Sequence, residues 1–481
     1  MITLSPAEAF KLGSSDYRQR EDTRAFIRRA LKGYEAKRDE NKDRFQDWQA
    51  ARDAAAAIKH EAIEHLDRYL AEFIEKAEAR GTKVFLAADG KRAKEHIISI
   101  IRDHNARSVI KSKSMTGEEI HLTQALEAEG FNVVESDLGE FIVQLREEPP
   151  FHIVFPAMHL KRDEISRLFH DKLGSKPTDS PEELTMIARR AIRQKYCEAD
   201  IGISGVNFAV AETGSMVMCT NEGNGRLSTS LPRIHIAIMG IEKVIPKMED
   251  LALLLPMLAT AGSGQHVTCY NTIITGPKRP DESDGPEEFH LVIMDNERTT
   301  LLADAQQRDA LHCIRCGACL NVCPIFKNVG GHSYGTTYPG PIGSVITPHL
   351  RGLQTWKHLS AASSLCGACT DACPVKIDLH HHLLHNRRNA IQGKKLWWEA
   401  LLFQGFGWVA ADGKRFALAA KLGRFFQPLH QLVKATPLDP LISWTRFRDL
   451  PEPPPYAFRE WWAARKAHKD DGRPTTEDRH E

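Results

Sequence analysis

Apolar side chains recur every three or four residues through the first part of the chain, and this spacing predicts helices over residues 15–80. The clearest stripe at helical spacing consists of Leu66, Tyr69, Leu70, Phe73 and Ile74. Between Glu35 and Asp53 charges of both signs are interleaved, which we interpret as a solvated helix face rather than a nucleic-acid site. The chain is therefore expected to begin with a helical region, with limits at residues 1–81.

From residue 82 onward the pattern changes, because short runs of β-branched and apolar residues alternate with helical stretches. The predicted strands cover residues 84–87, 108–110, 131–134, 140–144, 234–239, 267–275 and 289–295. The predicted helices cover residues 93–102, 118–128 and 181–197. Such alternation is typical of an α/β domain with a mostly parallel sheet, and we place this domain at residues 82–300.

Seven of the ten cysteines follow in a doubled pattern. The two runs are Cys313-x2-Cys316-x2-Cys319-x3-Cys323-Pro324 and Cys366-x2-Cys369-x3-Cys373-Pro374. This spacing is typical of bacterial ferredoxins that hold two four-iron clusters. Zinc also binds Cys-x2-Cys pairs, but seven thiols in a doubled pattern fit zinc poorly. We therefore predict an α-helical, ferredoxin-like domain with two iron–sulfur clusters at residues 301–392.

In such runs the fourth cysteine ligates the cluster of the other run. This rule predicts a first cluster held by Cys313, Cys316, Cys319 and Cys373. It predicts a second cluster held by Cys323, Cys366 and Cys369. Fifty residues beyond Cys313 the chain has Ser363, and a hydroxyl is a poor ligand for iron. Both clusters are expected to be 4Fe-4S. The fourth corner of the second is open, bound by a non-cysteine group, or missing, as in a 3Fe-4S cluster.

Composition excludes some classes of function. The 481 residues include 64 Lys and Arg against 63 Asp and Glu, so no net field attracts nucleic acid or acidic lipid. The chain shows no signal-peptide pattern and no membrane-spanning apolar run. We interpret three further cysteines as small buried residues in a reducing compartment, namely Cys197, Cys219 and Cys269. A cytoplasmic protein is expected, with peripheral placement at the inner membrane as the alternative.

Polar loops of the α/β region suggest binding but no catalysis. Residues 111–119 follow a strand and open a helix, where they either hold an anion or are only capped by Thr116. No glycine pattern indicates a nucleotide. Glu212 lies in an apolar stretch and is expected to form a structural ion pair. His312 and Arg315 flank the first thiolates and are candidate hydrogen-bond donors to them. We predict no catalytic residue.

After residue 392 the chain becomes aromatic and basic. We predict a helical C-terminal region at residues 393–481, with a disordered, charged tail from about residue 469. The aromatic stretch 397–408 is too short to span a bilayer. Docking onto partner subunits or onto the chain's own core is therefore favoured over binding at a membrane interface.

These regions together resemble the lactate utilization protein B family over nearly the whole chain. The resemblance rests on Cys313-Ile314-Arg315-Cys316-Gly317-Ala318-Cys319, on Ser364-Leu365-Cys366-Gly367-Ala368-Cys369, and on segments 111–119, 211–215, 221–224 and 276–278. It implies that the α/β region is a lactate-utilization domain similar in fold to sugar isomerases and CoA-transferases. It also implies that a second run of only three cysteines is a feature of the family.

The resemblance implies a function as well. It points to the iron–sulfur electron-transfer subunit of a three-protein bacterial system that oxidises L-lactate to pyruvate and allows growth on lactate. The partners would be a cysteine-rich redox subunit and a second protein with a lactate-utilization domain. No flavin or nicotinamide fingerprint is present, so hydride-level chemistry is expected on a partner, and the electron acceptor stays open. The alternatives are a subunit of another hydroxyacid or disulfide oxidoreductase, a cluster-based redox sensor, or an α/β transferase.

Overall fold

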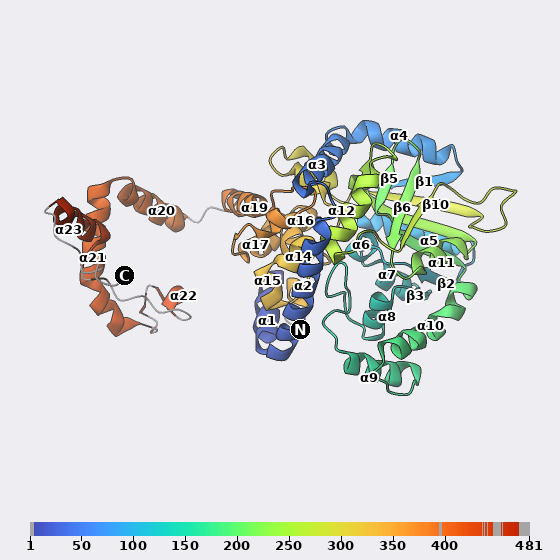
Figure 1. Cartoon of the computed structure of the whole chain (residues 1–481), viewed down its shortest axis with the longest axis horizontal. Helices are drawn as coiled ribbons and strands as arrows, with labels where there is room; N and C mark the ends of the chain where they lie inside the picture. Colours follow the sequence, from blue (N-terminus) through green and yellow to red (C-terminus); the bar gives the residue numbers. More distant parts are fainter. Residues whose placement is uncertain are drawn as a thin grey trace. The chain divides into compact units, whose positions relative to one another are not determined.

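The computed structural model describes residues 4–393, 397–434, 436, 438–439, 441–445, 454 and 456–470. The chain divides into two compact units, Met1–Gly393 and Lys394–Glu481. Both cysteine runs and the whole α/β domain belong to the first unit (Figure 1).

Four helices open the first unit and confirm the predicted helical start. They are α1 (Pro6–Gln19), α2 (Glu21–Lys42), α3 (Trp48–Glu64) and α4 (Leu66–Glu78). Ser5 and Glu8 form a capping box at the start of α1, and the Asp47 carboxylate accepts backbone N–H groups at the start of α3. The apolar stripe of α4 packs against the sheet that follows, so sequence periodicity and burial agree here.

A six-stranded parallel sheet forms the centre of the α/β domain, in the order β1-β10-β7-β4-β2-β3. Its strands are β1 (Thr82–Ala87), β10 (Glu288–Met294), β7 (Ile234–Gly240), β4 (Ile201–Gly205), β2 (Ser108–Lys111) and β3 (Asn132–Glu135). From β2 the chain passes to β3 on one side and returns to β4 on the other side. The strand order therefore reverses between β2 and β4, where α/β sheets commonly bind ligands at the carboxyl ends of their strands.

Helices cover both faces of this sheet, as a parallel sheet requires. One face packs on α5 (Gly90–Asp103) and α7 (Leu122–Ala128). The other face packs on α4 and on α8 (Leu138–Leu145), α9 (Arg162–Leu173) and α10 (Pro181–Glu198). The predicted α/β class with a parallel sheet is confirmed (Figure 1).

The domain has a second, smaller sheet with the strand order β8-β5-β6-β9. It consists of β5 (Phe208–Val210), β6 (Ser215–Thr220), β8 (Val244–Ile245) and β9 (Tyr270–Ile274). α11 (Asn224–Ser230) and α12 (Leu251–Ser263) accompany it. The predicted strand at 267–275 therefore exists in a shorter form, but as an edge of this second sheet.

Three local predictions in the α/β domain are wrong. Residues 140–144 form part of α8, because the Asp137 carboxylate caps a helix there by accepting from the Glu140 N–H. Glu212 lies in a turn after β5, and among the described residues its carboxylate accepts from the Met248 N–H rather than pairing with a cation. The helix at 115–119 is capped by Ser114, whose hydroxyl accepts from the Gly117 N–H at 3.1 Å, and not by Thr116.

The cysteine region folds as short helices around the two runs. They are η2 (Arg308–His312), α14 (Ala318–Val322), α15 (Pro324–Val329), η3 (His332–Tyr334), α16 (Gly340–Arg351), α17 (Leu353–Ala361), α18 (Ala368–Ala372) and α19 (Leu379–Gly393). α13 (Arg298–Ala303) leads into them from the sheet. The N-terminal helices α1 to α3 share one apolar core with this region. The cysteine runs are therefore enclosed by segments far apart in sequence.

The second unit consists of α20 (Trp397–Ala410), α21 (Gly413–Val433), α22 (Ile442–Thr445) and α23 (Phe458–Asp470). Its described aromatic residues are largely exposed, with Phe403 74% exposed and Phe425 72% exposed. The tail predicted to be disordered lies, beyond residue 470, outside the described residues. Within the described part of the chain, no helix has the length and apolar character needed to cross a membrane.

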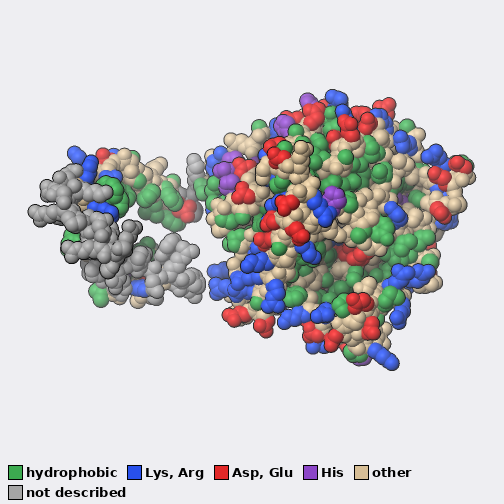
Figure 2. Space-filling view, viewed as in Figure 1, with side chains coloured by type: hydrophobic (Ala, Val, Ile, Leu, Met, Phe, Trp, Pro, Cys, Tyr) green, Lys and Arg blue, Asp and Glu red, His purple; other side chains and the backbone are tan. Residues whose placement is uncertain are grey.

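Charges of both signs are interspersed over the visible face of the first unit (Figure 2), as the near-equal totals of acidic and basic residues indicate. Cys197 and Cys269 are exposed, so the prediction that they are buried is wrong, and Cys219 is only partly buried. Cys197 lies in the last turn of a surface helix, and Cys269 precedes an edge strand.

Candidate functional site

Four of the predicted ligands meet in one small, mostly apolar cavity. The cavity is lined by Cys313, Cys316 and Cys319 of the first run together with Cys373 of the second. The remaining wall consists largely of aliphatic residues, including Ile153, Ile342, Val375 and Ile377. The chain therefore brings one thiol of the second run across to three thiols of the first.

The other three cysteines form a second group at a more open place. Burial and then the nearby Cys323 thiol raise the pKa of Cys369 to about 11, and Cys366 adds to this effect. Burial and Cys366 likewise raise the pKa of Cys323. Cys366 is exposed, whereas Cys323 and Cys369 are buried. Proximity thus groups Cys323, Cys366 and Cys369, with Cys369 also close enough to Cys319 of the first group to add to the effect of burial in raising the pKa of Cys319.

The sequence repeat is also a repeat of backbone geometry. Arg315 and Leu365 both adopt positive φ, at 61° and 55°, and Gly317 and Gly367 follow at 78° and 83°. Gly317 and Gly367 each start a short helix in which their carbonyl oxygens accept the N–H three residues later. Positive φ is the conformation that glycine tolerates best, which explains the glycine inside each Cys-x2-Cys turn.

Ser363 occupies the place in the second turn that Cys313 occupies in the first. The Arg315 N–H donates to Cys313 Sγ at 3.4 Å, and the Leu365 N–H donates to Ser363 Oγ at 3.2 Å. The missing ligand of the second run is therefore a change of side chain within a conserved turn geometry, not a change of backbone.

The chemistry of these thiols fits an iron–sulfur cluster. Burial, aided by the neighbouring cysteines, raises the pKa of Cys316 and Cys319, and burial raises the pKa of Cys373 to about 12. Thiols in such apolar surroundings become thiolates only when a metal supplies positive charge. Backbone N–H groups point to the sulfurs as well, from Ile377 to Cys373 and from Phe326 to Cys323. An all-sulfur donor set with N–H donors and little solvent suits iron–sulfur chemistry.

A buried ion network connects the first cysteine turn to the α/β domain. The Arg298 guanidinium donates two hydrogen bonds to the Glu119 carboxylate, at 2.9 and 2.8 Å, and one to Glu242 at 2.6 Å. The Tyr338 hydroxyl donates to Glu119 at 2.7 Å, and Arg315 donates to Glu242 at 3.3 Å. Although burial opposes it, Arg298 and then Arg315 lower the pKa of Glu242 to about 2. The network fixes the Arg315 side chain against the α/β domain, while its backbone N–H serves the thiol.

Arg52 of α3 connects the N-terminal helices to the second cysteine run. Its Nε donates to the Cys373 carbonyl oxygen at 2.9 Å, and its Nη2 donates to the Thr370 carbonyl oxygen at 3.1 Å. Arg52 is 7% exposed, so the interpretation of residues 35–53 as a solvated face is wrong at this position. Sequence alone did not mark Arg52, because its partners are carbonyl groups more than three hundred residues away.

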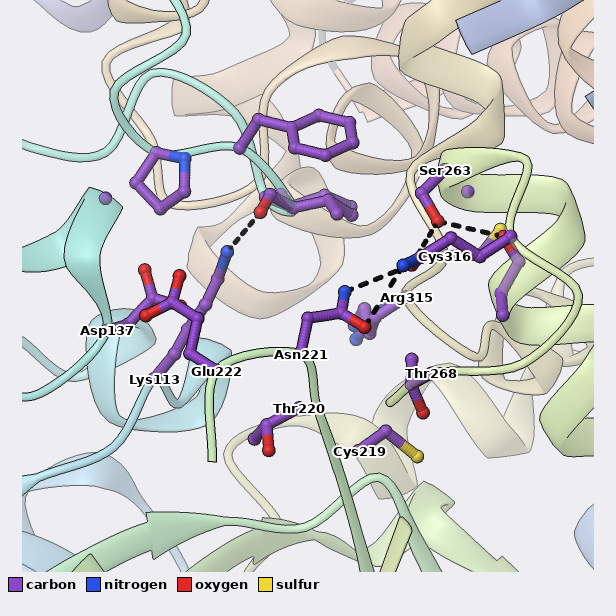
Figure 3. A pocket seen from close by; sticks show the side chains of 18 of the residues that line it. Lys113, Asp137, Cys219, Thr220, Asn221, Glu222, Ser263, Thr268, Arg315 and Cys316 are labelled. Atoms are coloured by element: carbon purple, nitrogen blue, oxygen red, sulfur yellow. Dashed lines mark hydrogen bonds between the residues drawn. The ribbon is translucent and has the colours of Figure 1, made fainter. Parts of the chain in front are cut away.

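A larger cavity, of about 510 Å³, lies between the α/β domain and the first cysteine turn. Lys113, Asp137 and Glu222 lie together on one side of it, and Arg315, Cys316 and Ser263 lie on the other (Figure 3). Asn221 and Gln265 exchange two hydrogen bonds in its wall, at 3.0 and 3.2 Å. The Lys113 ammonium donates to the Val154 carbonyl oxygen at 2.8 Å. Lys113 is therefore the residue of loop 111–119 that lines this cavity.

Lys111, by contrast, is fully buried and does not face a ligand site. Its ammonium pairs with Glu135 at 2.7 Å and with Glu118 at 3.0 Å. Burial opposes its charge, but these carboxylates raise its pKa. The loop is thus a helix start capped by Ser114 rather than by Thr116, and Lys111 forms an internal ion pair.

The fold and the two thiol groups define an α/β protein with a ferredoxin-like iron–sulfur region. Residues 309–377 match the 4Fe-4S dicluster domain, and residues 70–294 match the LUD domain. Residues 379–467 match the family described as lactate utilisation protein B, C-terminal. The chain belongs to the lactate utilization protein B family, as the sequence resemblance predicted.

Curated relatives of the same name are similar along nearly their whole length. The chain is 43% identical over 475 residues to lactate utilization protein B of Oceanobacillus iheyensis, covering 96% of this chain and 99% of the relative. It is 42% identical over 474 residues to lactate utilization protein B of Bacillus subtilis, covering 95% and 98%. It is 46% identical over 425 residues to that of Shouchella clausii, covering 87% and 89%.

Proposed function

We propose that this chain is the iron–sulfur electron-transfer subunit of a bacterial system that oxidises L-lactate to pyruvate. The observation that carries the proposal is the convergence of Cys373 with Cys313, Cys316 and Cys319 around one apolar cavity. That crossing is the ligand arrangement of two-cluster ferredoxins. The name shared by the curated relatives supports lactate as the fuel.

The ligand assignment follows from the two thiol groups. Cys313, Cys316, Cys319 and Cys373 hold the first cluster, and Cys323, Cys366 and Cys369 hold the second. Both are 4Fe-4S clusters when complete, with a 3Fe-4S form or a non-cysteine ligand as the alternative for the second. Bound at these thiols, the clusters supply one-electron acceptors and donors.

The protein's own residues prepare these sites. Backbone N–H groups of Arg315, Phe326 and Ile377 donate to the sulfurs and stabilise negative charge there. Aliphatic walls exclude water from the first group of thiols. Arg315 connects the first run to Glu242 of the α/β domain, and Arg52 connects the second run to the helical start. Neither thiol group includes a residue placed for proton abstraction from a hydroxyacid, so we assign that chemistry to a partner.

The partners in this proposal are a cysteine-rich redox subunit and a second protein with a lactate-utilization domain. The exposed aromatic residues of the C-terminal unit, such as Phe403 and Trp408, supply a surface for docking. We place the system in the cytoplasm, where thiols stay reduced and available to iron.

The test is to purify the chain anaerobically, count iron and sulfide, and record electron paramagnetic resonance (EPR) spectra before and after adding its partners. We expect two cluster signals that become reduced when L-lactate is added to the reconstituted system. Zinc in place of iron would contradict the cluster assignment. Reduction by glycolate but never by L-lactate would contradict the assigned substrate and leave the electron-transfer role standing.

A further inference from the structure

The 510 Å³ cavity lies where the topology of the sheet favours a ligand. Lys113 enters it from the loop after β2, and Asn207 enters it from the loop after β4. These are the two strands between which the strand order reverses. Open α/β sheets bind ligands in the crevice at this position, outside the carboxyl ends of the strands.

The same cavity has the first cysteine turn as one wall. Arg315 and Cys316 line it directly (Figure 3). Gly262 of α12 approaches the turn so closely that an added Cβ would lie 2.4 Å from the Cys316 carbonyl oxygen. A molecule in the cavity therefore lies against a residue whose thiol belongs to the first group, with no intervening layer of protein.

Size and lining indicate a fused ring rather than a small acid or a nucleotide. Cavities of this volume hold molecules much larger than a three-carbon acid. Apolar side chains form much of the wall, including Leu138, Ile142, Met158, Met218 and Leu258. Tyr34 and Phe155 stack at 4.2 Å beside them. The polar side of the cavity holds two carboxylates, Asp137 and Glu222, against one ammonium, Lys113, so its net charge does not favour a phosphate group.

Three buried polar atoms in the wall lack a hydrogen-bond partner among the described residues. They are Arg315 Nη1, Asn224 Oδ1 and Thr220 Oγ1. The Arg315 side chain is only 8% exposed, and its other terminal nitrogen, Nη2, is already bonded to Glu242. A buried donor of this kind normally has an acceptor, because an unpaired buried polar group is destabilising. A carbonyl oxygen on a ligand would meet this need.

We propose that this cavity binds a planar, redox-active ring that bears carbonyl oxygens, the chemistry shared by quinones and flavins. The ring packs among the apolar side chains, and one of its oxygens accepts from Arg315. The proposal that the ring binds here rests on the cavity alone. Electron exchange with the first cluster rests on the function proposed above.

The electron balance is simple. Two electrons leave the reduced clusters one at a time, through the first cluster, and each donating cluster is oxidised by one electron. The ring gains both electrons and two protons from solvent at the side of the cavity where Asp137 and Glu222 lie. Oxidation of the hydroxyacid by the partner supplies the electrons that reduce the clusters again.

Binding can be measured without turnover. The anaerobically purified holoprotein is dialysed to equilibrium against menadione, a naphthoquinone, and separately against riboflavin. We expect saturable binding of at least one of them at one site per chain. Menadione binding identifies a quinone and riboflavin binding a flavin, and either result supports the proposal. Absence of saturable binding for both compounds overturns it.

Matched variants locate the site. Met158→Trp fills the cavity and is expected to weaken binding at least tenfold, whereas Met186→Trp, on the exposed surface of α10, leaves it unchanged. Leu258→Trp, on α12, fills the cavity from another element and guards against misfolding of the first variant. Wild-type affinity in both filled variants, with iron content retained, would place the binding elsewhere and refute the site.

A second measurement separates binding from electron exchange. The EPR spectrum of the reduced first cluster is expected to change when the ring binds, because the ring lies beside Cys316. If menadione or riboflavin binds but leaves the cluster spectrum and its redox state unchanged, electron exchange is refuted. If no cluster forms while the ring still binds, the proposed electron-transfer function fails on its own.

Discussion

The two cysteine groups share one backbone turn but have very different surroundings. An added Cβ at Gly317 would lie 2.9 Å from Val154 and 3.1 Å from His152, whereas an added Cβ at Gly367 would meet nothing within 4 Å. Cys316 likewise lies in the cavity wall between two domains, and its counterpart Cys366 is exposed. Local sequence therefore sets the ligand spacing of both groups, while tertiary packing sets how accessible each group is.

Under the proposed function, this contrast gives the two sites different roles. The first group adjoins the α/β domain, the ion network of Arg298 and the large cavity, so it is suited to exchange electrons with a bound molecule. The second group reaches the surface at Cys366, so it is suited to exchange electrons with a partner protein. Four changes to the first unit test this difference between the two cysteine groups. A fifth change distinguishes the acid sensitivity of the sheet from that of the clusters.

Loss of a ligand should have the largest effect. Cys316→Ala removes a thiol of the first group and Cys366→Ala a thiol of the second, and each is expected to remove about half of the bound iron. Because Cys316 packs closely against α12 while Cys366 is exposed, Cys316→Ala should also lower the melting temperature more than Cys366→Ala. Iron analysis and thermal melting measure both effects. Cys269→Ala, at an exposed cysteine outside both groups, is the control and should keep all iron.

Arg298→Met should destabilise the first unit by about 3–5 kcal/mol, because it leaves two buried carboxylates without their cation. Urea unfolding measures the change. The matched control is Arg233→Met, whose ion pair with Glu287 is exposed to solvent, so its loss is expected to leave the unfolding free energy almost unchanged. We further expect Arg298→Met to broaden the EPR signal of the first cluster and to spare the second. Equal changes in both EPR signals would contradict the different surroundings of the two cysteine groups.

Ser363→Cys should give the second group its fourth thiol without moving the backbone, since Ser363 Oγ already accepts the hydrogen bond that Cys313 Sγ accepts in the first turn. Because iron prefers a thiolate to a hydroxyl ligand, we expect the half-life of the second cluster in air to increase by about tenfold. The decay of the visible absorbance in air measures this half-life. Ser364→Cys, one residue along, serves as the control, and the same gain there would exclude a ligand effect.

The paired glycines offer a smaller test. Alanine is strained at the positive φ of either residue, by about 1–2 kcal/mol. Gly317→Ala should cost more than Gly367→Ala, because only Gly317 is packed against Val154 and His152. The difference between the two unfolding free energies is the measured quantity. If it vanishes, the first turn is less closely packed than the structure has it.

The smallest expected effect separates acid sensitivity of the sheet from that of the clusters. His235 is buried in β7, where burial lowers its pKa to about 3, and its Nε2 lies 2.7 Å from Ser204 Oγ. Between the ordinary pKa near 6.5 and this value, only the unfolded chain takes up the proton. Stability therefore falls with falling pH, by at most about 1.4 kcal/mol per unit. His235→Gln should flatten this slope between pH 6.5 and 5 in urea titrations, and an unchanged slope would assign it to other groups.

Much of the fold could be predicted because its signals are local. The stripe of α4 and the alternation of strands with helices follow from side-chain periodicity, and both appear in the structure. The error at residues 140–144 has the same origin, since a short apolar run fits a buried strand as well as a helix. Asp137 was the missing signal, because a side chain that caps a backbone N–H three residues later marks a helix start.

The candidate site divides in the same way. The cysteine spacing indicated iron–sulfur chemistry and the crossed grouping, and the structure places the thiols in two groups compatible with it. The spacing gave no indication of Arg52, Arg298 or the large cavity. These depend on contacts such as Arg298 with Glu119, which are 179 residues apart. Periodicity cannot report such contacts.

By itself, then, the sequence determined the class of this protein, because the spacing of thiols around a tight turn is a property of a few consecutive residues. It also showed that Ser363 stands where the first run has Cys313. Only the tertiary structure decided that Cys316 packs against the α/β domain while its counterpart Cys366 is exposed, and that a cavity adjoins Cys316. The physical reason is that burial and electrostatic environment are set by the residues packed around a turn, and here those residues come from segments far apart in the chain.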